Sequence, residues 1–375
     1  TEYSLGNPKP DSLDARQITA LEEIARTGLR HFKEQLCAHA LSRCESLLRD
    51  ALASGLAEHA GAIGAYRANP MKNRTAVFAN SPGTAQAAAY AQVCRQNGAP
   101  FISFQHGVGR EIAKNHNEGQ AWYEPAVSDV CFTYNDAATQ ASAGSPYAAG
   151  CHCVTVGISQ QHRRVAGTHL GKNPKELPCL YVSTTVYRAN HNRLSGWMTD
   201  QQAASWEISL VENVLAKLRR RTIFKPYVAP QRYLGVDPVV DIVKRTPSVE
   251  LYDRPIDLRY LLRKPAIVIV ARATSTLSWC LLSGNPIVYI DIPSQTSLTD
   301  EARSAFEKGV FYFDSGTSYA EQLVELLAQP NDAVLEAWEE KAAAREELIR
   351  SFVAGSPGSG GRRAANVVED MLQKR

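Results

Sequence analysis

The segment 265–270 reads Pro-Ala-Ile-Val-Ile-Val and contains no polar side chain. A strand with one face in water alternates apolar and polar residues, so an all-apolar run predicts a strand that is covered on both faces. Such strands are typical of parallel sheets with helices on both sides. This segment therefore favours an α/β protein.

The rest of the chain alternates in the same way between short strand-like runs and segments with helical spacing of apolar residues. The expected strands span 75–79, 100–104, 130–134, 153–156, 179–183, 222–225, 249–252, 265–270 and 286–290. The expected helices span 84–96, 201–219, 276–282, 319–327 and 332–352, with one more after a Gly- and Ser-rich loop at 354–361. Residues 17–55 have the apolar spacing of amphipathic helices and precede the first strand.

The length and the restart of this pattern predict two domains. The chain has 375 residues, and a single core stops growing at roughly 250–300 residues. The strand–helix pattern stops near residue 160 and begins again near residue 178. We therefore expect two Rossmann-like domains facing a cleft, residues 1–165 with the leading helices and residues 166–375. Open α/β sheets bind ligands beyond the carboxyl ends of their strands, so the cleft is the expected binding site.

The composition argues against several classes of protein. The chain has 41 basic and 38 acidic residues, a balance that does not predict nucleic-acid binding. Eight cysteines occur without a CxxC pair, which favours free thiols in a reducing cytoplasm over zinc ligands or disulfides. No apolar run approaches the ~20 residues of a membrane span, and no signal peptide opens the chain. We expect a cytoplasmic protein whose membrane contact, if any, is peripheral at the inner face. Its first residue is Thr, which leaves open that it is one module of a longer protein.

The expected strand at 100–104 is followed by Gln105, His106 and Gly107. In this fold a strand end presents side chains to the cleft, and a glycine there lets the chain turn sharply. His106 can serve as a general base or contact a phosphate or sugar; the alternative is a core histidine bonded to the backbone. Gln105 and Gly107 are expected to contact the substrate beside it.

A carboxylate for acid or base catalysis is expected in the polar loop that follows. Glu118 lies between Asn117 and Gly119, where no helical pattern explains its presence. Asp129 directly precedes a strand, as turn and cap residues do, and Glu124 precedes a proline in a turn. Glu118 is therefore the catalytic candidate, with Glu124, Asp129 or a residue of the second domain such as Asp200 as open alternatives.

Three hydroxyl residues, Thr274, Ser275 and Thr276, follow the all-apolar strand and open the next helix. Hydroxyls and free backbone N–H groups at such a position bind phosphate. A helix cap needs only one hydroxyl, so three favour a phosphate site over a plain cap. Lys225 and Tyr227 follow another strand end, where the lysine can pair with a phosphate or simply lie on the surface before a rigid turn.

Ser183, Thr184 and Arg188 complete the set of candidate ligand-binding residues. They follow the first expected strand of the second domain and can line the same cleft, or form a solvated turn. The sequence contains no acidic pair of the DxD type, which argues against a metal-dependent sugar-nucleotide site. We therefore expect no metal ligands and no cofactor.

Several of these motifs together resemble GT-B glycosyltransferases. The strand ending in Gln-His-Gly, the turn at Lys225-Pro226, and the Thr/Ser loop that precedes a helix and a Gly-Asn-Pro turn at 284–286 carry the likeness. The resemblance is to transferases of bacterial surface polysaccharides, including the capsule and lipopolysaccharide Kdo transferases and nonulosonic-acid transferases. It covers most of residues 75–365 in the order of elements and a few short motifs in identity. In that group a Lys-Pro-His-Pro turn and a Ser/Thr pair contact the nucleotide, often cytidine monophosphate; here Tyr227 stands in place of the histidine.

The resemblance implies a metal-independent transferase that moves a sugar from a nucleotide sugar to a bacterial surface glycan or glycolipid. The donor it suggests is a CMP-sugar carrying Kdo or a sialic-acid-like nonulosonic acid, bound as substrate by the second domain. Three alternatives stay open: a sugar-nucleotide epimerase of the same fold, a glycerophosphate transferase, and a glycan- or nucleotide-binding module without catalysis.

Overall fold

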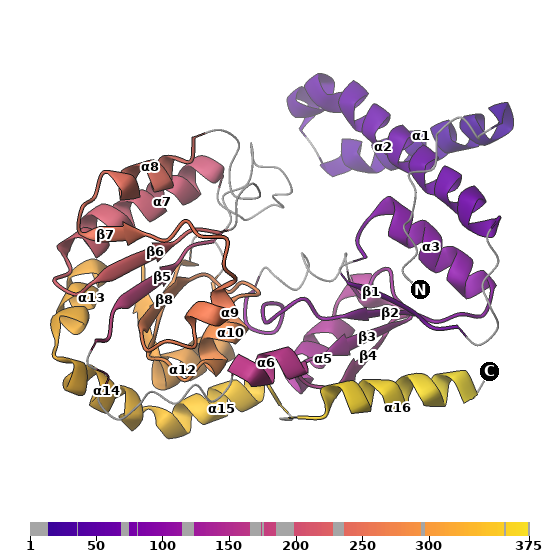
Figure 1. Cartoon of the computed structure of the whole chain (residues 1–375). Coiled ribbons are helices and arrows are strands. Elements are labelled where there is room, and N and C mark those ends of the chain that lie inside the picture. Colours follow the sequence, from indigo (N-terminus) through magenta and orange to yellow (C-terminus); the bar gives the residue numbers. More distant parts are fainter. Residues whose placement is uncertain are drawn as a thin grey trace.

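A computed structural model of the chain describes residues 14–35, 37–68, 75–80, 82–114, 124–165, 174, 176–184, 199–227, 236–293, 297–355 and 358–373. These residues form two α/β units, each built on a parallel sheet (Figure 1). The predicted class, two Rossmann-like units with leading helices, is confirmed.

The first sheet has four parallel strands in the order of the sequence. They are β1 (Val77–Asn80), β2 (Phe101–Phe104), β3 (Val130–Thr133) and β4 (His152–Thr155). Successive side chains of a strand point to opposite faces, and β2 shows the result. Phe101 packs with Cys94 of α3 (Ala85–Gln96), whereas Ile102 packs with Ala364 of α16 (Gly360–Gln373). The two helices therefore cover opposite faces of this sheet.

Two long helices precede the sheet, as the amphipathic pattern predicted. They are α1 (Ala15–Gln35) and α2 (Ala38–Arg67), and α2 packs through Ala62 and Tyr66 against Ala89 and Val93 of α3. Three short elements follow β3 and β4: α5 (Asp136–Ala143), η2 (Pro146–Ala148) and α6 (Gln160–Val165). None of the helices that the structure describes has the length and apolar character needed to cross a bilayer.

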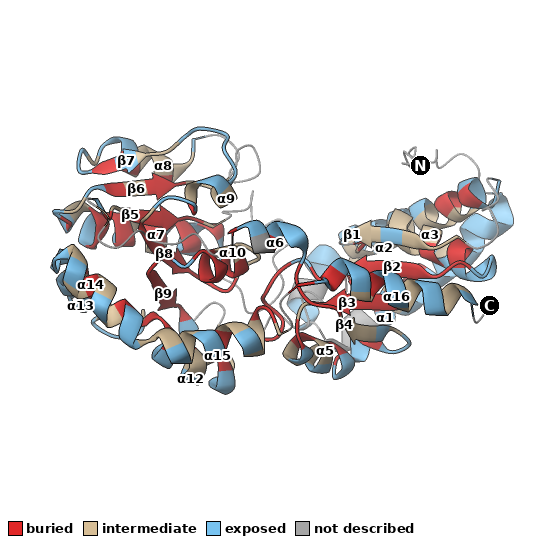
Figure 2. Cartoon of the chain, turned by 60° about the horizontal axis from the view of Figure 1, so that its bottom comes forward, coloured by how far each residue is buried: buried red, intermediate tan, exposed pale blue. Residues whose placement is uncertain are grey.

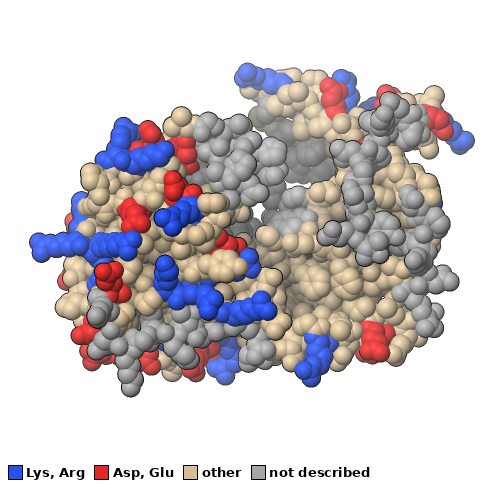
Figure 3. Space-filling view, viewed as in Figure 1, with Lys and Arg blue, Asp and Glu red and all other residues tan. Residues whose placement is uncertain are grey.

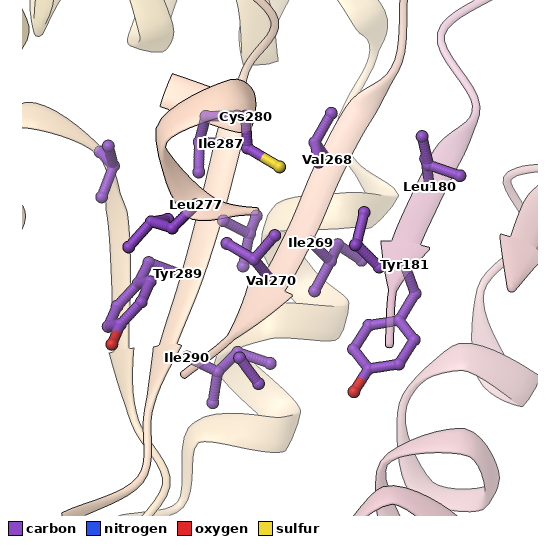
Figure 4. Packing of buried hydrophobic residues seen from close by; sticks show 14 of the residues in the cluster. Leu180, Tyr181, Val268, Ile269, Val270, Leu277, Cys280, Ile287, Tyr289 and Ile290 are labelled. Atoms are coloured by element: carbon purple, nitrogen blue, oxygen red, sulfur yellow. The ribbon is translucent and has the colours of Figure 1, made fainter. Parts of the chain in front are cut away.

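The second sheet has six parallel strands in the order β7-β6-β5-β8-β9-β10. They are β5 (Cys179–Val182), β6 (Thr222–Lys225), β7 (Val249–Leu251), β8 (Ile267–Ala271), β9 (Ile287–Asp291) and β10 (Phe311–Asp314). Counted within this unit, the order is 3-2-1-4-5-6, that of a doubly wound dinucleotide-binding sheet. Every residue of β8 and β9 is buried, as the all-apolar run predicted (Figures 2 and 4).

Helices surround this sheet on both faces, and their bounds differ in places from the expected ones. They are α7 (Asp200–Asn213), η4 (Leu215–Lys217), α8 (Pro238–Lys244), α9 (Leu258–Leu261), α10 (Leu277–Leu282), α12 (Asp300–Gly309), α13 (Tyr319–Ala328), α14 (Asn331–Glu340) and α15 (Ala342–Phe352). The expected helix at 332–352 is two helices, and β10, α5, α6, α8, α9 and α12 were not predicted.

A loop of the first unit enters the core of the second. Val108, Ile112 and Ala113, which follow β2, belong to the hydrophobic cluster of the second sheet. The backbone N–H of Thr299 donates to the carbonyl of Ile112 at 2.8 Å, and that of Lys114 donates to Ser297 at 2.9 Å. The two units are therefore joined through one hydrophobic core.

The C-terminal helix α16 makes the reverse connection. The expected division at residues 165 and 166 places it in the second domain, but Ala364, Val367, Val368 and Met371 pack against the first sheet (Figures 1 and 2). Gly360 permits this contact, because a Cβ there would lie 2.7 Å from the carbonyl oxygen of Ile158. The apolar spacing of a helix shows that it covers a sheet but not which sheet it covers. The boundary between the two domains stays a prediction.

Candidate functional site

A cavity of about 750 Å³ lies where the carboxyl ends of β2, β3 and β4 meet the second unit. The first unit lines it with Phe104, Gln105, His106, Gly107, Tyr134 and the segment 156–162, the second with Ser275 and Trp279, and the start of α16 with residues 359–362 and Ala364. The predicted Gln-His-Gly segment and Ser275 of the predicted Thr/Ser loop therefore border one cavity, whereas Thr274 and Thr276 are not among its lining residues.

Gly107 brings these two segments into contact. Its φ angle is +125°, a region that residues with side chains rarely adopt. A Cβ on Gly107 would lie 2.6 Å from the Cα of Ser275. Glycine is thus required both for the turn and for the close approach between the two units.

The Gln105 side chain holds the end of β2 in place. It is buried, and its Nε2 donates to the carbonyl of Gly107 at 2.9 Å and to Oε1 of Glu111 at 3.0 Å. Its Oε1 accepts from the N–H of Tyr134, just beyond β3, at 2.8 Å. Gln105 borders the cavity, but its described hydrogen bonds connect two strand ends and the loop between the units.

Glu111 lies below the cavity as a buried carboxyl group. Besides Gln105, it accepts from the N–H of Gly109 at 3.0 Å and from Nδ2 of Asn135 at 3.2 Å. Burial raises the pKa of Glu111, while these donors act in the opposite direction. The group fixes the loop and does not border the cavity.

His106 directs an exposed side chain into the cavity, while its backbone N–H donates to Oε1 of Glu124 at 2.7 Å. Desolvation by the surrounding protein lowers the pKa of His106 below its ordinary value of 6.5. The imidazole is therefore neutral at pH 7 and able to accept a proton.

The candidate carboxylates fall into two groups. Glu118 lies outside the described residues. The candidate binding residue Arg188 lies outside them as well. Glu124 is fully buried in an ion pair with Arg110, which also donates to Oγ of Ser142 at 2.7 Å. Asp129 accepts from the N–H of Phe101 at 2.8 Å and pairs with Arg95. Glu124 and Asp129 are thus held in structural contacts.

The predicted residues of the second unit follow three neighbouring strands. Ser183 and Thr184 follow β5, residues 274–276 follow β8, and Lys225 ends β6. β5 pairs with both β6 and β8. The strand order reverses between β5 and β8, and ligands of such sheets bind at this reversal, the topological switch point.

The Thr/Ser loop is held in a specific shape. Arg272, before it, has a φ angle of +78°, which is unusual for a residue with a side chain. The hydroxyls of Thr274 and Thr276 lie 2.8 Å apart. Thr276 occupies the N-cap position of α10, yet its side chain makes no capping hydrogen bond. The Thr276 hydroxyl is therefore not used as a helix cap.

Lys225 and Ser183 lie deeper, outside the lining of the cavity. The Nζ of Lys225 donates to the carbonyl of Pro226 at 3.3 Å and lies 5.9 Å from the ring centre of Tyr252. Burial lowers the pKa of this lysine. Ser183 donates to the buried carboxylate of Glu207, and Thr184 and Tyr227 are half-buried.

His162 and Trp279 are among the cavity residues that had not been predicted. His162 of α6 stacks on Trp279 of α10, with ring centres 3.6 Å apart and planes 10° from parallel. Its ring nitrogens lie 3.0 Å from Oγ of Ser159 and 3.4 Å from Oγ of Ser278. Burial, with a smaller effect of Arg259, lowers the pKa of His162 to about 4. The stack joins the two units, and no local sequence signal indicates a pair 117 positions apart.

Within the parts of the chain that the structure describes, no group of three His, Cys, Asp or Glu side chains is placed to hold a metal ion. The cavity is lined by hydroxyl and carboxamide groups, aromatic rings, the imidazoles of His106 and His162, and Arg362 at the start of α16. Its polar residues come from both units.

Two Rossmann-like units that meet at the carboxyl ends of their strands define the GT-B class of fold. The solved structure of a putative UDP-N-acetylglucosamine 2-epimerase from Listeria monocytogenes superposes with a TM-score of 0.51 at 12% identity, covering 84% of this chain and 79% of that one. UGT89C1 from Arabidopsis thaliana, complexed with UDP, gives 0.49 at 10% identity over 84% and 77%. MurG from Acinetobacter baumannii gives 0.43 at 14% identity over 85% and 78%. At these identities the likeness concerns the fold alone.

The sequence model of the LIC12162 family of transferases matches residues 20–357. The chain belongs to this family, and the expectation of an enzyme, a transferase, is confirmed. Comparison with curated protein sequences gives no match.

Proposed function

We propose that the protein is a metal-independent glycosyltransferase with a nucleotide sugar as donor and a glycan or glycolipid as acceptor. The observation that supports this most is the contact between Gly107 and Ser275. It sets the switch point of the second sheet, where a nucleotide would bind, beside His106 and the cavity of the first unit. A donor at residues 274–276 therefore lies next to the space for an acceptor.

The chemistry assigned to these residues follows from the reaction. The bond between the sugar carbon and the phosphate oxygen breaks, and a bond to an acceptor oxygen forms while that oxygen loses its proton. Neutral His106 can accept this proton. The hydroxyls of residues 274–276, together with Lys225, would stabilise the departing phosphate. Glu118 is proposed as the carboxylate that assists transfer, because Glu124 and Asp129 are occupied in structural contacts.

The identity of the donor is proposed from the sequence motifs. We favour a CMP-linked Kdo or nonulosonic acid, transferred on the cytoplasmic side of the membrane to a bacterial surface glycan. A second candidate is epimerisation of a free nucleotide sugar, the activity for which the Listeria protein is named. Donors labelled in the sugar distinguish the two, since transfer moves the label to an acceptor and epimerisation leaves it on the nucleotide. Membership of a transferase family favours the first outcome.

Changing Thr274, Ser275 and Thr276 together to alanine is expected to weaken nucleotide binding ~10-fold or more. Each lost hydroxyl contact is worth roughly 0.5–1.5 kcal/mol, and more where the acceptor is charged. Thermal shift with CMP and UDP measures the effect, since a bound ligand raises the melting temperature. Ser248→Ala, an exposed hydroxyl of the same unit, serves as control. Unchanged affinity in a folded triple variant would leave these residues a structural role only.

His106→Ala is expected to lower turnover at least ~100-fold, the lower range for loss of a general base, with little change in melting temperature. Because desolvation lowers the pKa of His106, the wild-type rate should fall only as the pH drops through a pKa below the ordinary histidine value. This acid limb should vanish in the variant, while His39→Ala, an exposed histidine of α2, should keep it. Loss of several kcal/mol of stability with the rate retained would identify a core histidine instead.

A further inference from the structure

An apolar groove of about 760 Å³ runs beside the cavity, between α16 and the β1 edge of the first sheet. Phe78 and Phe104 line its sheet side, and Val368 and Leu372 line its helix side. Glu369 and Gln373 are the polar residues among its lining.

The register of the sheet explains why the groove is open. Phe78 pairs with Ile102, and paired residues of neighbouring strands point to the same face. Ile102 is fully buried under α16, whereas Phe78 is 52% exposed because the helix does not cover the edge strand. Phe104 is 36% exposed, and its ring centre lies 5.9 Å from that of Phe78 with the planes 27° apart. Two adjacent exposed aromatic rings at the edge of the sheet indicate a binding surface.

The groove is continuous with the cavity. Phe104, Gly361 and Ala364 line both. Glu369 is the single charged residue among the described residues that line the groove. Where the first unit is drawn in colour in Figure 3, few charged side chains are seen on that face. A molecule that fills the groove can therefore reach the space beside His106, as the tail of a substrate would.

We propose that the acceptor is amphiphilic, with its sugar head group in the cavity and a hydrocarbon tail in the groove. The naming of the occupant as the acceptor rests on the proposed glycosyl transfer. The apolar lining, the continuity with the cavity and the polar residues of the cavity itself together match a glycolipid. An acceptor of this class presents its reacting hydroxyl at the carboxyl end of β2 while its tail follows α16.

The test is the affinity of the full chain for methyl, butyl and octyl β-D-glucoside, measured by calorimetry below the micellar concentration. Each added methylene that is buried should tighten binding by on the order of threefold to fourfold. Ala365→Asp introduces a charge at an exposed position that lines the groove, and it should remove the dependence on chain length. Asn366→Asp puts the same charge on the same helix outside the groove, and it should keep that dependence.

Equal affinity for the three glucosides overturns the proposal, as does a dependence that Ala365→Asp leaves intact. Dimerisation that Ala365→Asp abolishes would overturn it too, because a second copy would then be the occupant. The measurement needs no donor, so its outcome is separate from that of glycosyl transfer. Chain-length-dependent binding without transfer of a sugar supports the groove and rejects the proposed glycosyl transfer. Transfer that is equally fast to acceptors with and without a tail supports glycosyl transfer and rejects the groove.

Discussion

Gly107→Ala is expected to lower kcat/KM at least ~100-fold while both sheets stay folded. The variant must adopt a φ angle of +125° and place a methyl group 2.6 Å from the backbone of Ser275. The strained backbone costs about 1–3 kcal/mol, and the contact is relieved only if the loop moves away from Ser275. A displacement of about 1 Å between reacting groups is enough for a loss on the order of 100-fold. Kinetics at several donor concentrations and far-UV circular dichroism measure the two effects.

Gly150→Ala is the matched control for this variant. Gly150 also has a positive φ angle, +94°, but a Cβ there meets no atom within 4 Å. It should share the conformational penalty and keep its turnover. If the two variants turn over equally fast, the contact between Gly107 and Ser275 has no part in the reaction.

Glu118→Gln is expected to cut turnover at saturating donor by at least ~100-fold, with nucleotide affinity and stability unchanged. The substitution keeps the shape of the side chain and removes its ability to take a proton or stabilise positive charge on the sugar. General acid–base catalysis typically contributes about 100- to 10,000-fold. Rates and nucleotide affinity measured on the same preparation separate a lost interaction in the transition state from weaker binding.

Glu124→Gln should produce the opposite result, because it leaves the buried charge of Arg110 without its partner. Breaking a buried ion pair in this way typically costs roughly 3–5 kcal/mol. The variant should unfold at a clearly lower denaturant concentration, and its remaining folded fraction should turn over at close to the wild-type rate. A stable Glu124→Gln protein with a strongly reduced rate would transfer the catalytic role from Glu118 to Glu124.

The strands were the most predictable part of the fold, because burial on both faces leaves a local signature in the sequence. Nine of the ten described strands coincide with expected ones. The exception is β10, an edge strand of four residues whose register is set by pairing with β9. The break between α14 and α15 is also a tertiary effect. It falls at Lys341, whose Nζ donates to the carbonyls of Glu307 and Lys308 at the end of α12.

The candidate site was predictable where its residues directly follow strands. His106 and Ser275 are of this kind, since the topology of a parallel sheet brings such positions to one edge. His162 and Trp279 are not, because each lies in a short helix and the pair forms only when the two units meet. The groove depends on where α16 packs. Its partner strands lie more than 200 residues earlier in the chain. A local sequence pattern does not indicate which distant strands a helix will contact.

The reciprocal packing of loop 107–114 and helix α16 restricts how this enzyme can be recombined with its relatives. Each unit carries a piece that completes the other, since Val108 and Ile112 are buried in the second core and Val367 packs on the first sheet. A chimera joined near residue 165 would place this loop against a foreign surface and leave the first sheet under a foreign helix. Exchange of specificity between relatives is therefore easier through the loops around the cavity than through whole halves of the chain. In evolutionary terms, the two halves are expected to change together.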